Sequence, residues 1–215
     1  MFKGLVKDAA PLGLETGHVD IVTDRLRLSP LDPEHRSAVV AALSDGTVAR
    51  NLTRVPFPYT DEDFDRSTVE FSETGREGEL RLAISDWKTG AFLGVIGLRS
   101  GEQHPEIGFW LARPYWDKGI MREAAAALLD HIFALSEQKV IRAGYFVDNQ
   151  RSAKVLGFLG FREIGSSRVY SLARGEDVDH RDMELTREAY FGTGSKSDGA
   201  WHRAQNRADS YTMNY

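Results

Sequence analysis

The stretch PYWDKGIMREAAAALL, residues 114–129, lies where a predicted strand gives way to a long helix. Apolar side chains follow Gly119 at helical spacing: Ile120, Ala124, Ala127, Leu128, Ile132 and Leu135. The segment before it, PEIGFWLA, alternates apolar residues as a strand does, and VIRAGYFV after it reads as another strand. A strand–helix–strand order predicts a right-handed crossover with local parallel pairing.

The segments on either side predict further strands and helices. TDRLRLSPL is typical of a first strand, and ELRLAIS and AFLGVIGLRS flank a turn at residues 86–90, which predicts a hairpin. FREIGSSRVYSL and HRDMELT predict a second hairpin. Helices are expected to begin at Asp32-Pro33 and at Thr60-Asp61, and a short helix in DNQRSAKVLGFLG should end at Gly160. The fold class predicted is α/β.

The composition and chain length predict one domain with two extensions. The chain has 215 residues, of which 41% are hydrophobic and 27% charged, which suits a folded protein. Residues 20–191 are expected to form the domain and residues 1–19 an N-terminal arm. Residues 192–215 are polar and rich in glycine and serine, which predicts a flexible tail.

Several classes of partner and site are excluded by composition. The chain has no cysteine, so disulfides and thiolate metal sites are ruled out, and its histidines show no ligand spacing, so no metal is expected. A net charge of −5 argues against nucleic acid as a general partner. No apolar run is long enough to cross a membrane and no secretory signal is evident, so we expect a cytoplasmic protein without a membrane partner.

The turn before the long helix has the parts of an anion site. The first N–H groups of a helix lack partners and lie at the positive end of its dipole, which suits a phosphate. Gly119 allows close backbone approach, and Lys118 and Arg122 add positive charge. On these residues alone, a simple turn is the alternative interpretation.

The segment EIGFWLARPYWDKGIMREAAAALLDHIF resembles the cofactor-binding core of the GNAT acetyltransferase superfamily, most closely its Rim-type branch. NQRSAKVLGFLGF is similar to the family's Asn-x-x-Ser helix followed by Gly-Phe, and TDRLRLSPL to its first strand. The resemblance covers residues 21–186. It implies a mixed, mostly antiparallel sheet with a splayed parallel pair and flanking helices, and acetyl-CoA as cosubstrate.

The resemblance also implies cofactor-binding residues. Backbone N–H groups of the turn would hold the pyrophosphate of CoA: Lys118, Gly119, Ile120, Met121 and Arg122. Trp110 and Leu111 would pair through their backbones with the pantetheine arm, which Asn149 would also touch. Trp116, Asp117 and Met121 depart from the family pattern at the turn.

Acetyl transfer to an amine needs a neutral amine and a protonated leaving thiolate. Glu106 is the candidate for deprotonating the amine, and a positioning role is its alternative. A protein N-terminal amine needs less help than lysine, since its reference pKa is about 7.7–8.0 against about 10.4. Leu156 stands where many members of the superfamily have an acidic tyrosine, so Ser152 is the substitute proposed for the thiolate. Ser152 could instead only cap its helix.

The sequence thus predicts an enzyme, an acetyl-CoA-dependent N-acetyltransferase acting on a protein or peptide N-terminal amine. A small-amine acetyltransferase for polyamines or aminoglycosides is the first alternative; a deep acidic pocket would favour it, and the acidic stretch TDEDFD keeps it open. A non-catalytic acyl-CoA-binding module is the second, favoured by Leu156 and Met121. The sequence leaves open whether the protein forms a homodimer.

Overall fold

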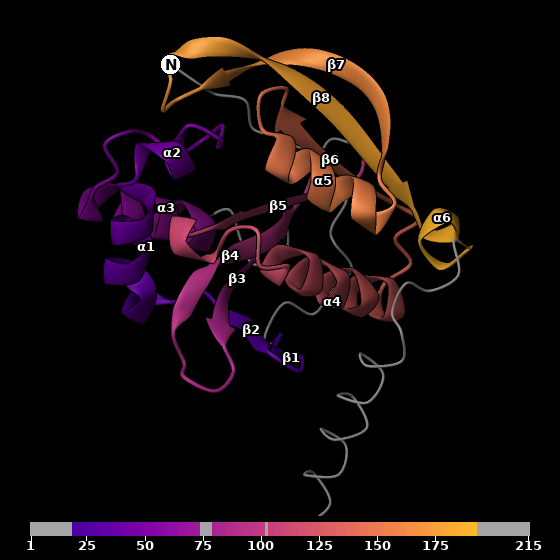
Figure 1. The fold of residues 1–215 in the computed structure, drawn as a ribbon, viewed down its shortest axis with the longest axis horizontal. Helices are drawn as coiled ribbons and strands as arrows, with labels where there is room; N and C mark the ends of the chain where they lie inside the picture. Colours follow the sequence, from indigo (N-terminus) through magenta and orange to yellow (C-terminus); the bar gives the residue numbers. More distant parts are fainter. Residues whose placement is uncertain (1–18, 74–78, 102, 193–215) are drawn as a thin grey trace, which may run out of the picture.

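One mixed sheet runs through the part of the chain that the computed structural model describes, residues 19–73, 79–101 and 103–192 (Figure 1). Its strands are β1 (Ile21–Val22), β2 (Leu26–Pro30), β3 (Glu79–Asp86), β4 (Phe92–Arg99), β5 (Glu106–Leu111), β6 (Val140–Phe146), β7 (Arg162–Ser171) and β8 (Glu176–Thr186). The spatial order is β1-β2-β3-β4-β5-β6-β8-β7, and every neighbouring pair is antiparallel except β5 and β6. The predicted fold class is confirmed.

The helices are α1 (Arg36–Leu43), α2 (Gly46–Ala49), α3 (Asp61–Glu73), α4 (Ile120–Leu135), α5 (Gln150–Leu159) and α6 (Arg187–Gly192), with 3-10 turns η2 (Pro33–His35) and η3 (Arg113–Tyr115). Asp32 begins η2 as predicted, with its carboxylate accepting from the Glu34 N–H at 3.0 Å. Neither α2 nor α6 was predicted from the sequence.

The two faces of the sheet are covered by different helices (Figure 1). On one face α4 packs against β2 to β5, and its Leu128 and Ile132 are fully buried against strand residues such as Leu82 and Ile96. Burying one such side chain contributes about 1.5–3 kcal/mol. On the other face a smaller apolar cluster joins α1, α2 and α3 to Phe92 of β4 and Trp110 of β5. The strands are thereby fixed from both sides.

β5 and β6 separate soon after they meet. β5 pairs with β4 along its whole length but with β6 at a single position, Glu106 opposite Arg142. The Ala112 N–H donates to Leu93 of β4, and the Arg142 N–H of β6 donates to the Pro105 carbonyl. Backbone groups alternate in direction along a strand, so those of the odd-numbered residues of β5 face β6. The divergence leaves these groups along an opening in the sheet, as the resemblance implied.

The β7–β8 hairpin arches over the opened sheet and its turn docks on the loop after α2 (Figure 1). The Leu172 N–H donates to the Thr53 carbonyl at 3.0 Å, and Arg174 Nε donates to the Arg50 carbonyl at 2.8 Å. Both terminal nitrogens of Arg174 also reach the Asp148 carboxylate at 2.9 Å. The second hairpin is thus confirmed. That β8, rather than β7, pairs with β6 was not predicted from the sequence.

The ends of the predicted domain agree with the folded part only approximately. Val19, assigned to the arm, is 4% exposed and belongs to the main core. Tyr190 and Phe191 of α6 pack against Phe133 of α4. Residues 1–18 of the arm and 193–215 of the tail lie outside the described residues. Among those that are described, no helix has the length and apolar character to span a membrane.

Candidate active site

The turn before α4 is built from two left-handed residues. Gly119 is the N-cap with φ 75°, and Asp117 has φ 59°. A left-handed residue with a side chain is uncommon, although aspartate tolerates this conformation better than most. Arg25 holds the turn from behind, because its guanidinium donates to the Lys118 carbonyl at 3.3 Å and pairs with the buried Glu123 of α4. The first N–H groups of α4 therefore have a fixed direction.

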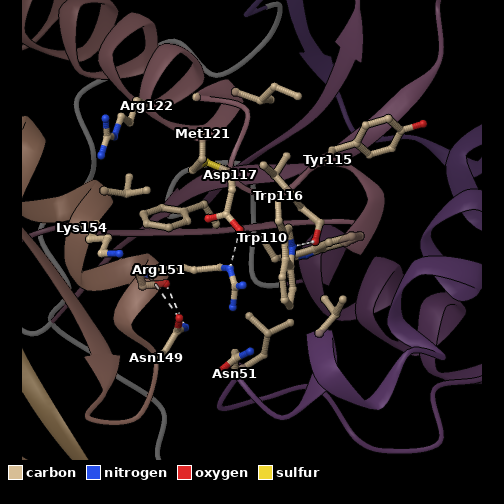
Figure 2. Close-up of a pocket in the computed structure, with 18 residues that line it drawn as sticks. Asn51, Trp110, Tyr115, Trp116, Asp117, Met121, Arg122, Asn149, Arg151 and Lys154 are labelled. Carbon is tan, nitrogen blue, oxygen red and sulfur yellow. Dashed lines mark hydrogen bonds and ion pairs between the residues drawn. The ribbon is translucent and has the colours of Figure 1, made fainter.

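These N–H groups face a cavity of about 330 Å³. The turn, β5, α5 and the loop after α2 surround it (Figure 2). Seven of the eight residues predicted to bind the cofactor line it, and they are Trp110, Leu111, Gly119, Ile120, Met121, Arg122 and Asn149. Lys118 is not among the lining residues, since its ammonium lies over the Tyr115 ring, 5.8 Å from the centroid.

Positive charge reaches the cavity from two helices. Arg122 of α4 and Arg151 and Lys154 of α5 line it on the same side (Figure 2). Arg151 Nε donates to the Asp117 carboxylate at 3.1 Å, and its guanidinium stacks 4.8 Å from the Trp116 ring centroid. Asp117 is therefore paired, which reduces its repulsion of a bound anion. Arg151 and Lys154 were missed, although their i, i+3 spacing on a helix flanking the turn could have indicated them.

The free edge of β5 is offered by Phe109 and Leu111 rather than by Trp110. The register directs the backbone of Trp110 toward β4, and only its side chain is left for the cavity. The Leu111 carbonyl accepts from Trp116 Nε1 at 2.8 Å. The groups directed at the opening are the Leu111 N–H and both backbone groups of Phe109. The backbone role predicted for Trp110 therefore suits Phe109 better, and we propose it for Phe109 and Leu111.

Asn149 and Ser152 are joined at the start of α5. Asn149 is its N-cap and accepts from the Ser152 N–H at 3.2 Å, while its amide donates to Ser152 Oγ at 2.9 Å. The hydroxyl is thus an acceptor in this contact, so its own proton remains available to a second partner. Leu156, one turn further on, is fully buried and lines neither cavity.

A second cavity of about 110 Å³ adjoins the first and shares five lining residues with it, namely Asn51, Leu52, Phe109, Asn149 and Ser152. Glu106 lines only this smaller cavity, where Arg99 Nη2 donates to its carboxylate at 2.5 Å. His180 of β8 lies in the same wall. The sequence analysis did not select His180, because nothing in its neighbourhood along the chain indicated a site.

Comparison with known proteins agrees with this arrangement. A family model described as an acetyltransferase (GNAT) domain matches residues 25–162. The chain belongs to the GNAT acetyltransferase family. It is 29% identical over 177 residues to the uncharacterized N-acetyltransferase p20 of Bacillus licheniformis, covering 80% of this chain and 98% of that protein.

Rim-type proteins are among the other relatives of this GNAT acetyltransferase. It is 31% identical over 80 residues to the ribosomal protein uS5-alanine N-acetyltransferase of Escherichia coli, which covers 37% of this chain and 41% of that enzyme. Its fold matches RimJ of Mycobacterium smegmatis, solved in complex with CoA-disulfide, with a TM-score of 0.68 at 22% identity over 85% of this chain and 89% of that one. The chain is thus an N-acetyltransferase, and its family supports acetyl-CoA as the cosubstrate.

The residues present fit the cosubstrate of a GNAT acetyltransferase. A left-handed glycine before α4, cations on α4 and α5, and an open edge on β5 match the pyrophosphate and the amide-bearing arm of CoA. One described group has ligand-like spacing for a metal, formed by Asp32, Glu34 and His35. Asp32 and His35 there form the capping box of η2, which explains their proximity.

Proposed function

We propose that this GNAT acetyltransferase transfers the acetyl group of acetyl-CoA to the N-terminal α-amine of a protein or peptide. The observation that carries the proposal is the small second cavity, which meets the larger one beside Asn149 and Ser152. An acceptor in the smaller cavity brings its amine to a thioester held along β5 in the larger one. Holding two reactants in this way supplies much of the acceleration in acyl transfer.

The charge of the smaller cavity favours an acceptor with one positive group. Glu106 is the acidic residue among those that line it, and Arg99 already pairs with that carboxylate. Polyamines and aminoglycosides carry several ammonium groups and need several carboxylates. The acidic stretch at residues 60–65 does not supply them, since it lies on the exposed first turn of α3 and lines neither cavity. A single α-amine matches the charge present.

The docked hairpin favours a slender acceptor. The turn between β7 and β8 is bonded to the loop after α2 at Arg50, Leu52 and Thr53, so the smaller cavity is roofed on that side. An extended peptide terminus can enter such a channel, whereas a folded surface with a lysine upon it meets the hairpin first. The lower pKa of an α-amine also places more of it in the reactive neutral form near pH 7.

In this proposal each polar group has one task. The N–H groups of Gly119 to Arg122 hold the pyrophosphate, and Phe109 and Leu111 hold the pantetheine arm. Glu106, anchored by Arg99, accepts a hydrogen bond from the acceptor amine. The Ser152 hydroxyl, which accepts from Asn149, donates its proton toward the departing thiolate.

The test is product mass after incubation with acetyl-CoA and a panel of acceptors. Peptides with free N-termini, the same peptides with blocked N-termini and an internal lysine, polyamines and aminoglycosides form the panel. We expect acetylation of the free-terminus peptides, located at the α-amine by fragmentation. Acetylation confined to polyamines or aminoglycosides would overturn the proposed acceptor, and CoA binding without turnover on any amine would favour a binding module.

A further inference from the structure

The His180 ring can lie where it does because the residue beside it on β6 is a glycine. The ring lies against Gly144 of β6, in the wall of the smaller cavity. A Cβ on Gly144 would collide with Cε1 of the ring and lie 2.5 Å from Nε2. The ring also meets Phe146 edge-on, with centroids 5.9 Å apart at 79°. The absence of a side chain at Gly144 thus lets the Cε1–Nε2 edge of the ring lie against β6, where both residues line the smaller cavity.

Asp182 determines the chemistry of this ring. His180 Nδ1 lies 2.9 Å from Asp182 Oδ1, which also accepts from the Ser167 hydroxyl at 3.0 Å. An ionised carboxylate can only accept hydrogen bonds, so it favours the tautomer with the proton on Nδ1. Nε2 of the neutral ring then carries a lone pair and can take up a proton. The His180 side chain is 14% exposed, which limits competition from bulk water.

Glu106 is less suited to take up the proton. Of the described residues that line the smaller cavity, Glu106 and His180 are the two that offer a carboxylate or an imidazole to the acceptor. The Glu106 carboxylate is engaged by Arg99 at 2.5 Å, and protonating it would break that charged hydrogen bond. Protonating His180 instead creates a charged pair with Asp182. Taking up a proton is therefore less costly at His180 than at Glu106.

We infer that His180, oriented by Asp182, is the base that removes a proton from the acceptor ammonium, directly or through one water. This inference rests on the proposed function. The freed amine nitrogen attacks the thioester carbonyl carbon, the C–N bond forms and the C–S bond breaks. The second proton of the nitrogen passes to the sulfur through the Ser152 hydroxyl. His180 afterwards releases its proton to solvent, so one amide, one thiol and one proton are the products.

The test uses chemical rescue in the full-length enzyme. His180→Ala should lower kcat by about 10²-fold or more, within the usual range for a general base, with unchanged affinity for CoA. Added imidazole should restore part of kcat, and substituted imidazoles should restore more as their basicity rises. A structural histidine would not show this dependence. If the alanine variant folds poorly, His180→Gln, closer in size, tests the loss of kcat without rescue, because its side chain leaves no room for imidazole. His131→Gln on α4 is the matched control.

Asp182→Asn provides an independent readout. An asparagine amide can donate to Nδ1, which moves the proton to Nε2 and removes the lone pair that the inference requires. Its kcat should fall, and imidazole should not restore it because the ring still occupies the site. Wild-type kcat in His180→Ala, or a loss that no imidazole restores in the folded alanine variant, would overturn the inference. If the wild type acetylates only another class of amine, the proposed acceptor is wrong and the rescue is measured on that amine.

Discussion

At the scale of single residues, the proposed pyrophosphate site depends on the backbone of Gly119. Its φ of 75° admits Asn and Asp more readily than other side chains, and a Cβ there would have Arg25 Nη2 as its nearest neighbour at 3.8 Å. Gly119→Asp and Gly119→Asn therefore differ mainly in charge. Two unit charges ~6 Å apart repel by about 3 kcal/mol at an effective dielectric constant of ~20.

The first prediction follows from that repulsion. Gly119→Asp should weaken CoA binding by about tenfold or more relative to Gly119→Asn, as measured by calorimetry at low salt. The asparagine variant reports the backbone effect alone. Equal affinities for CoA in the two variants would show that the pyrophosphate is bound elsewhere.

Ser152 gives the second prediction at this scale. Ser152→Ala removes a proton donor but keeps the backbone N–H that Asn149 accepts, so α5 should remain capped. We expect kcat to fall by about 10²-fold, the lower end for acid–base catalysis because water can substitute. The loss should be smaller with an acetyl donor whose leaving thiol is more acidic. Ser166→Ala, on the exposed face of β7, is the matched control, and an equal loss with both donors would leave Ser152 a structural role.

At the scale of elements, α5 contains a glycine with room for a side chain. Gly157 is exposed, and an added Cβ has no atom within 4 Å outside the helix backbone. Gly157→Ala should therefore raise the free energy of unfolding by about 0.5–1 kcal/mol in a urea titration. Gly160→Ala should lower it, since φ is 96° at this C-cap. Destabilisation by Gly157→Ala would mean that α5 packs against a further surface there.

In the proposed function the β7–β8 hairpin roofs the acceptor channel, and Arg174 fastens its turn to the loop after α2. Arg174→Ala removes the bonds to Asp148 and to the Arg50 carbonyl. The acceptor KM should rise several-fold, while the affinity for CoA stays unchanged because the first cavity is not touched. Arg168→Ala, which removes an exposed pair with Asp179 in the same hairpin, is the control. An unchanged acceptor KM in Arg174→Ala would show that the β7–β8 hairpin takes no part in acceptor binding.

The pair formed by Arg174 and Asp148 should make the free energy of unfolding depend on pH. Hydrogen bonds from Arg174 hold the pKa of the Asp148 carboxyl below its usual value. A carboxyl whose pKa is depressed on folding stabilises the folded state at pH values above its unfolded pKa of ~3.9. This stabilisation is lost as the pH falls through the pKa of the folded state. The difference in urea stability between wild type and Asp148→Asn should therefore be largest near pH 6 and shrink below ~pH 4. A difference that grows on acidification would contradict the assignment.

At the scale of the whole molecule, α6 closes the described fold. The Tyr190 hydroxyl donates to the Asp130 carboxylate at 2.8 Å, and its ring packs 5.4 Å from Phe133. Burial, together with the nearby carboxylate, raises the pKa of Tyr190. This helix therefore packs against the main core.

The last prediction compares two truncations. A chain ending at Gly192 should keep its Tm within about 4 °C of the full chain, since a change of ~1 kcal/mol shifts Tm by only about 2–4 °C at this size. A chain ending at Thr186 loses α6 and should melt about 10 °C or more lower. Differential scanning calorimetry measures both. A large drop on removing residues 193–215 alone would show that this segment contributes to the folded state.

The sequence by itself determined the parts of the molecule that local physics governs. Glycine at Gly119 and Gly160, aspartate at Asp32, and helical or alternating apolar spacing act within one or two turns of chain. They were enough to place α4, α5, the β3–β4 hairpin and the turn before α4. With the family resemblance, they also selected Glu106 and eight of the eighteen residues that line the larger cavity.

Only the tertiary structure decided what long-range pairing brings together. Placement of β8 between β6 and β7 sets His180 across Gly144, and no local pattern encodes the partner of a strand. The divergence of β5 from β6 decided which backbone groups are free, and these belong to Phe109 and Leu111 rather than to Trp110. Docking of the hairpin on the loop after α2 holds Leu52 and Thr53, which line the smaller cavity. These features depend on contacts between residues far apart in the chain, whose energies arise only after the sheet has formed.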